Sequence, residues 1–101
     1  MQIITDANLY DVWISPQNQI IAVGERGAIF QYHDEKWTKM ISDTNNDLVS
    51  IWGFDESNIY AVGDSGTIIH FNGLTWKKLT IDTNSDLRCI WGSSENNFYW
   101  Q

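Results

Sequence analysis

Length, composition and charge narrow the classes of protein to which this chain can belong. It has 101 residues, six of them tryptophan, and its 13 acidic against 6 basic residues give a formal net charge of −7. Phosphate groups bind to basic patches, so this charge argues against nucleic acid and against anionic membranes as partners. No apolar run is long enough to span a membrane.

The single cysteine, Cys89, excludes an internal disulfide, which fits a reducing compartment. Residues 1–13 contain neither the basic segment nor the apolar core of a signal peptide. These features leave the location of the protein open and favour the cytoplasm.

An internal repeat of 39 residues decides the predicted organisation of the chain. Residues 9–47 and 48–86 are identical at 14 of 39 aligned positions, and residues 86–99 match residues 47–60 at 8 of 14. Chance would give only about two or three identities over such a unit. Five tryptophans fall at two repeated places, an early one (Trp13, Trp52, Trp91) and a late one (Trp37, Trp76).

In chain order, the repeat predicts a partial strand, two complete units and a half unit. Residues 1–8 align with a fourth, outer strand, residues 9–47 and 48–86 form the complete units, and residues 87–101 supply a first and a second strand. Within the second unit the pattern predicts strands at 48–53, 59–63, 67–71 and 75–81. Asp64-Ser65-Gly66 and Asn72-Gly73 predict tight turns, because glycine accepts a positive φ.

The two middle strands of a unit are apolar on both faces, so their sheet must be covered on both faces. A four-stranded antiparallel meander of about 40 residues that stacks between copies of itself is a β-propeller blade. We therefore predict an all-β fold of about two and a half propeller blades, with a β-solenoid as the alternative. The repeated tryptophans and glycines are expected to form the structural core of each blade: Trp13, Trp52, Trp91, Trp37, Trp76, Gly24, Gly63, Gly27 and Gly66.

The second unit also resembles a known family. The pair Trp52-Gly53, followed by NIYAVGDSGTIIHFNGLTW at 58–76, is similar to blades of bacterial propellers of the photosystem II assembly-factor and sialidase-repeat (BNR or Asp-box) type. This resemblance implies the propeller fold. A sialidase activity would need an arginine cluster and a tyrosine nucleophile, whereas the two arginines, Arg26 and Arg88, stand at non-equivalent repeat positions.

We predict no catalytic residue, no cofactor and no metal. His33, His70 and Cys89 have no partner at metal-ligand spacing, and no base stands beside Cys89. The segments 43–47 and 82–86 repeat the pattern Asp-Thr-Asn-x-Asp, but they lack the glycine and the closing glutamate of a calcium loop. These segments are expected to cap the link between blades.

An arc of fewer than three blades leaves two outer blade faces bare, each of about 320 Å² for four strands of five residues. Apolar faces of this size mark interaction surfaces. We therefore expect head-to-tail self-assembly into a closed ring, with a dimer favoured over a trimer. The junction between copies is predicted at Ile3 and Ile4 of one copy and at Phe98 and Trp100 of the next.

The function favoured by the sequence is that of a non-enzymatic propeller that binds or scaffolds a partner, with a protein or glycan ligand left open. The alternative is an oligomeric lectin that holds sugars on tryptophans between blades, and a sialidase-type hydrolase is the least favoured. The candidate ligand-binding residues are Trp37, Trp76 and Tyr60.

Overall fold

Ten short strands and two single-turn 3-10 helices make up the part of the chain that the computed structural model describes, residues 7–79, 84–94 and 97–100. The 3-10 helices η1 (Glu25–Gly27) and η2 (Asp64–Gly66) join β2 to β3 and β6 to β7. The strands are β1 (Leu9–Ile14), β2 (Ile20–Gly24), β3 (Ile29–His33), β4 (Lys36–Met40), β5 (Leu48–Asp55), β6 (Asn58–Gly63), β7 (Ile68–Phe71), β8 (Trp76–Leu79), β9 (Ile90–Ser94) and β10 (Asn97–Trp100). The prediction of an all-β fold is confirmed.

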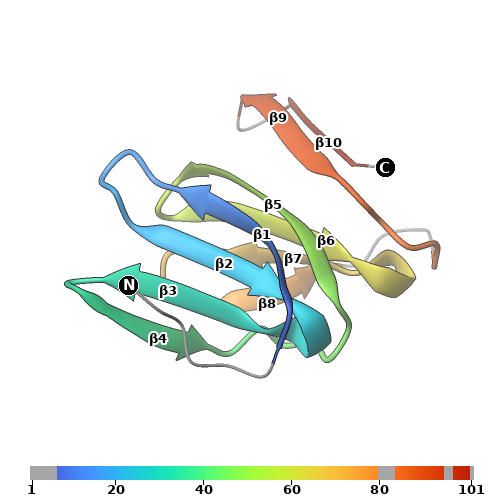
Figure 1. Cartoon of the computed structure of the whole chain (residues 1–101). Coiled ribbons are helices and arrows are strands. Elements are labelled where there is room, and N and C mark those ends of the chain that lie inside the picture. The colour runs from blue at the N-terminus through green and yellow to red at the C-terminus, as the bar shows by residue number, and fades with distance from the viewer. Residues whose placement is uncertain (1–6, 80–83, 95–96, 101) are drawn as a thin grey trace.

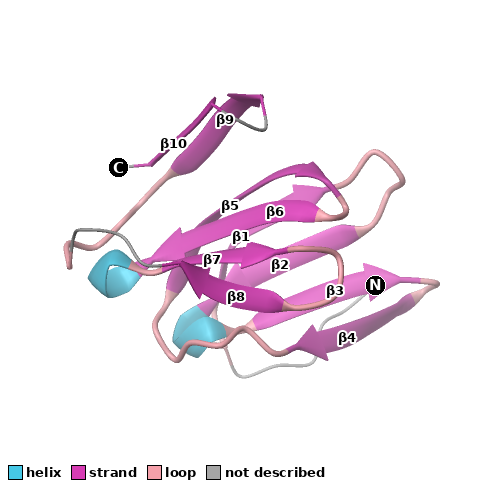
Figure 2. Cartoon of the chain, turned by 180° about the vertical axis from the view of Figure 1, so that it is seen from behind, coloured by secondary structure: helices cyan, strands magenta, loops and turns pink. Residues whose placement is uncertain are grey.

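Three antiparallel sheets follow one another along the chain (Figure 1). The first sheet has the strand order β1-β2-β3-β4, the second has the order β5-β6-β7-β8, and β9 pairs with β10. In both four-stranded sheets, strands that are consecutive in the chain are neighbours, because short turns join them. The helices η1 and η2 lie on the same side of the molecule (Figure 2), which is called the turn end below.

The second sheet matches the strands predicted for it. Strands β5 to β8 begin and end within two residues of the predicted limits, as far as residue 79, since residues 80–83 lie outside the described part. The two sheets share their pairing register: Trp13 pairs with Ile21, and 39 residues later Trp52 pairs with Tyr60. A bulge interrupts β1 and β5 at the same point of the repeat.

The main core lies between the two four-stranded sheets. Alternation along a strand sends every second side chain to the same face, and the facing residues of both sheets are apolar. The first sheet contributes Ile21, Val23, Ile29, Trp13 and Met40, and the second contributes Leu48, Ile51, Ile59, Ala61, Ile69, Phe71 and Trp76. A second cluster of Val62, Ile68, Leu87 and Ile90 forms on the opposite face of the second sheet. Apolar side chains are thus buried on both faces of this sheet, as its sequence pattern predicted.

The first strands of consecutive sheets lie side by side, with β1 next to β5 and β5 next to β9. One hydrogen bond recurs between them. The N–H of Ile51 donates to the carboxylate of Asp11 at 2.9 Å, and the N–H of Ile90 donates to the hydroxyl of Ser50 at 3.1 Å. Asp11 and Ser50 occupy the same repeat position. In both four-stranded sheets, the side chain at this position therefore binds the first strand of the next sheet.

Candidate functional site

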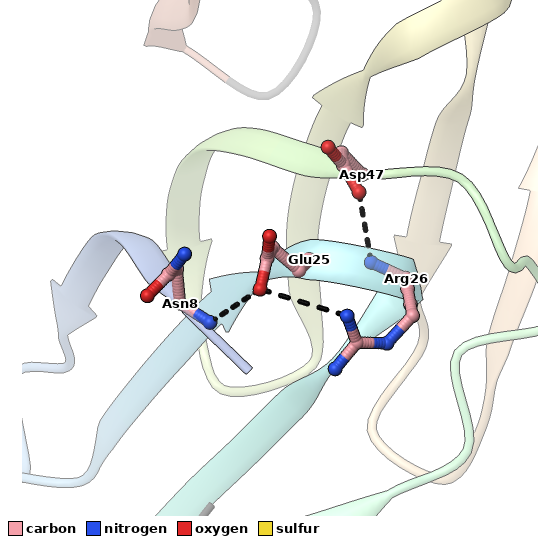
Figure 3. Close-up of polar contacts among 4 residues, drawn as sticks. All are labelled: Asn8, Glu25, Arg26 and Asp47. Carbon is pink, nitrogen blue, oxygen red and sulfur yellow. Dashed lines mark hydrogen bonds and ion pairs between the residues drawn. The ribbon is translucent and has the colours of Figure 1, made fainter. Parts of the chain in front are cut away.

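Polar contacts at the turn end recur from sheet to sheet, and Figure 3 shows those around η1. The carboxylate of Asp47 accepts a hydrogen bond from the backbone N–H of Arg26 at 2.9 Å, and Asp86 accepts one from Ser65, also at 2.9 Å. Arg26 and Ser65 both have a positive φ, of 56° and 59°. The last aspartate of each Asp-Thr-Asn-x-Asp segment therefore caps the turn of the preceding sheet.

Two glycines allow the chain to pass close to this turn. A Cβ atom at Gly24 would overlap the backbone carbonyl oxygen of Asn8, and one at Gly63 would overlap that of Asp47. In each case the N–H of the residue after the glycine donates to the same oxygen, at 2.9 and 3.1 Å. The repeated glycines are therefore sites of backbone contact, where any side chain would force the strands apart.

Negative charges repel one another at the turn end. Desolvation, followed by the carboxylates of Asp86 and Asp47, raises the pKa of Asp64 against a smaller opposing effect of Arg88. Desolvation and the nearby carboxylates also raise the pKa of Tyr10. Among the described residues, no group of three or more His, Cys, Asp or Glu side chains is placed to hold a metal ion. The contacts of this end serve the connection between sheets.

Replacing Asp47 by alanine should lower the free energy of unfolding by about 1 kcal/mol, because the N–H of Arg26 loses its acceptor. Asp47→Asn retains a side-chain oxygen and should retain most of the stability. Urea denaturation of the two variants measures the difference. Equal losses in both would mean that the charge of Asp47, and not its hydrogen bond, carries the effect.

The three candidate ligand-binding residues lie on three different faces. Trp37 in β4 lies on the side of the first sheet that is turned away from the second sheet, with its ring tilted by 53° against that of Tyr32 and the ring centroids 5.0 Å apart. Trp76 in β8 is buried between the two sheets. Tyr60 lies on the opposite face of the second sheet, 4.6 Å from the ring of His70. The structure therefore does not bring any two of these three residues together.

Three indole nitrogens, those of Trp37, Trp52 and Trp76, are buried without a hydrogen-bond partner among the described residues. A buried donor without an acceptor can indicate a missing ligand. Trp37 and Trp76 share a repeat position, however, and Trp76 is already covered by the first sheet. Both four-stranded sheets thus have an unpaired indole N–H at this position of the outer strand, including the sheet in which another sheet covers it. The unpaired N–H therefore does not indicate a ligand.

A cleft of about 650 Å³ opens between the outer strands of the two sheets. It is lined on one side by Lys39 and Ile41 and on the other by Leu74, Trp76 and Lys77. Ile41 and Leu74 are 89% and 86% exposed, unusually high for large aliphatic side chains. The cleft thus combines exposed apolar side chains with two lysines and the carboxylate of Asp43.

The sequence analysis did not single out this cleft. All four lysines of the chain, Lys36, Lys39, Lys77 and Lys78, lie in β4 and β8, in a protein that is otherwise acidic. This clustering was visible in the sequence. Lysines also protect edge strands from pairing with other sheets, which is a sufficient reason for their presence here.

The face of the first sheet that is turned away from the second sheet is apolar, and is called the outer face below. Its residues, given by the strand pairing, are Val12, Ile14, Ile20, Ala22, Phe30, Tyr32 and Trp37, together with one charged residue, Lys39. Val12 and Ile14 are 52% and 60% exposed, whereas Ile51, the repeat equivalent of Val12, is 5% exposed beneath the first sheet. The repeat thus leaves the β1 side of the outer face in contact with solvent, whereas Ala22 and Phe30 on the same face are buried.

Of the predicted junction residues, Ile3 and Ile4 lie outside the described residues. Phe98 and Trp100 belong to β10, which pairs only with β9 within the described part. Cys89 is exposed, at the repeat position that Asp11 and Ser50 use to hold the next sheet.

One side-chain hydrogen bond recurs with different residues. Gln31 donates to Gln19 at 3.1 Å in the first sheet, and at the equivalent places His70 lies 2.7 Å from the side-chain oxygen of Asn58. Partial burial lowers the pKa of His70 below 6.5. The histidine is therefore held neutral, and its ring replaces the glutamine amide.

This pair predicts a pH effect on stability. Protonation of His70 disfavours the fold, so the contribution of this pair to stability is fully present above the unfolded pKa of the histidine and is lost as the pH falls through its lower, folded pKa. The variant His70→Gln should keep the hydrogen bond and lose this dependence. Urea denaturation between about pH 7 and pH 5 should show wild type losing more stability than the variant. A difference between the two proteins that is independent of pH would contradict the assignment.

Comparisons with protein families, with curated proteins and with solved structures found no match. No relative therefore assigns a function to the cleft or to the outer face. Within the described residues, none of the helices has the length and apolar character that crossing a membrane requires.

Proposed function

We propose that this chain is a non-enzymatic β-propeller protein of the BNR-like repeat type, whose copies join into a closed ring that binds a partner. Two stacked four-stranded meanders with a shared register, followed by a two-stranded sheet, support this proposal. Propeller blades stack in this order, with the first strand of each blade beside that of the next.

The single observation that carries the proposal is the outer face. Positions that are buried in the second sheet, such as Ile51, are exposed in the first sheet at Val12. Among the described strands, β9 and β10 pair only with each other. A second copy would supply the sheet that the exposed part of the outer face lacks.

The area of contact favours a ring over an open chain of copies. One pair of mated faces buries about 640 Å² in total, which is in the range of crystal-packing contacts. A ring of two copies forms two such junctions, about 1,300 Å², which reaches the range of specific interfaces. Closure also leaves no bare face at either end.

The cleft between the outer strands supports the binding role. Its exposed Ile41 and Leu74 provide apolar contact, and Lys39 and Lys77 provide positive charge. This combination favours an acidic protein segment with apolar side chains as the ligand. The lectin alternative has less support, since the candidate aromatic residues lie on three faces and Trp76 is buried.

Light scattering coupled to size exclusion tests the ring directly. We expect a mass of twice the 11.7 kDa of one chain at high concentration. The mass of a single chain at every concentration would contradict the proposal. A glycan array, read with tryptophan fluorescence, tests the lectin alternative on the same sample.

A further inference from the structure

The contact between the two four-stranded sheets includes a close approach of a tryptophan to a glycine. Trp13 in β1 places its indole over Gly53 in β5, so that a Cβ atom built at Gly53 would overlap the ring. The absence of a side chain at residue 53 therefore allows the sheets to approach to their observed separation.

In each unit the residue directly after the early tryptophan is a glycine, with one exception. Trp52 is followed by Gly53, and Trp91 by Gly92, but Trp13 is followed by Ile14. Trp13 faces Gly53 of the next unit, and the 39-residue repeat would make Gly92 the counterpart of Gly53 for Trp52. Trp91 in β9 pairs with Tyr99 in β10 as Trp52 in β5 pairs with Tyr60 in β6, so the backbone of Trp91 holds the same place in its sheet.

In the ring proposed above, Trp91 of one copy would approach the outer face of the next copy. The residue at the receiving position is Ile14, which is 60% exposed. The equivalent site within the chain, Gly53, has no room for even one side-chain carbon. The isoleucine at position 14 has four. The two sheets cannot reach the same separation without moving one of these side chains.

We infer that Ile14 obstructs the junction between copies and makes it weaker than the contact between sheets within a chain. This inference depends on the proposed self-association, with a second copy as the occupant of the outer face. The obstruction makes the assembly reversible, because it weakens the intermolecular contact and leaves the intramolecular one unaffected. Ile14 thus distinguishes the first sheet from the two that follow, which have glycine at this position.

Dissociation constants of Ile14→Gly and Ile14→Ala, measured by sedimentation against wild type, test the inference. Ile14→Gly recreates the receiving site of Gly53, and we expect association about tenfold tighter than wild type. Ile14→Ala removes most of the same apolar area but keeps the Cβ, so it should not associate more tightly than wild type. Thermal melts confirm that both variants fold.

A glycine variant that associates more weakly than wild type, or no better than the alanine variant, would overturn the inference. If wild type associates and the Ile14→Gly variant associates more weakly, the obstruction alone is overturned and the proposed ring stands. Wild type and Ile14→Gly that are both single chains would overturn the ring and the obstruction together.

A change in the opposing residue gives a second test if the glycine variant fails to fold. Trp91→Val shortens the side chain that would meet Ile14, and it should also tighten association. Weaker association of this variant would contradict the inference. In the double variant with Ile14→Gly the two gains should not add, because both relieve the same contact.

Discussion

Gly63→Ala should lower the free energy of unfolding by about 3 kcal/mol, a large part of the total for a domain of this size. The added Cβ would overlap the carbonyl oxygen of Asp47. Both groups belong to the backbone, so neither can turn aside as a side chain would. Relief requires separating β6 from the start of β5, which also breaks the hydrogen bond from Asp64 N–H to Asp47, now 3.1 Å long.

Urea denaturation followed by circular dichroism measures this loss. Asp64→Asn, one residue away, is the matched control, because it changes a half-buried side chain of the same turn without adding volume. It should stay within about 0.5 kcal/mol of wild type. Gly24→Ala should repeat the effect of Gly63→Ala, because its Cβ would meet the carbonyl of Asn8. A loss of less than about 1 kcal/mol for Gly63→Ala would show that the backbone contact is not needed.

Val12→Glu should weaken self-association by at least about a hundredfold. Val12 is 52% exposed on the outer face, while its equivalent Ile51 is covered by a sheet. Covering the outer face in the same way would bury the new carboxylate without a partner. The single chain should fold as before, because the glutamate remains in water until a second copy arrives.

The control for this variant separates burial from charge. Asn45→Glu adds the same charge at an exposed position of the segment between β4 and β5. It should associate almost as wild type does, since position 45 lies away from the outer face. Equal weakening by both variants would attribute the effect to net charge, and no weakening by Val12→Glu would rule out the outer face as the contact surface.

The sequence predicted the strands because the repeat identifies equivalent positions and strand residues are strongly apolar there. Asp64-Ser65-Gly66 was correctly placed as a turn, but its detail was not predicted. Ser65 takes a positive φ that favours glycine, and Asp86, 21 residues away, accepts its N–H. Such a contact depends on how the polar segment crosses the sheet, which no local pattern encodes.

The candidate ligand-binding residues show what the sequence could not predict about the site. Trp37 and Trp76 share a repeat position, yet one lies on the outer face and the other is buried between sheets. A repeat predicts equal roles within a unit, but burial depends on what stands on either side of it. The lysine-lined cleft was missed for a related reason, since β4 and β8 come together only when the sheets stack.

Contact between the outer face and a second copy is tested most directly by isotope-filtered nuclear Overhauser spectroscopy. One copy carries labelled Val and Ile methyl groups, and the other is unlabelled. We expect intermolecular signals from the methyl groups of Val12 and Ile14 to aromatic protons of the second copy. A sample with twice the single-chain mass that gives no such signal from either residue would contradict the assignment of the outer face as the junction.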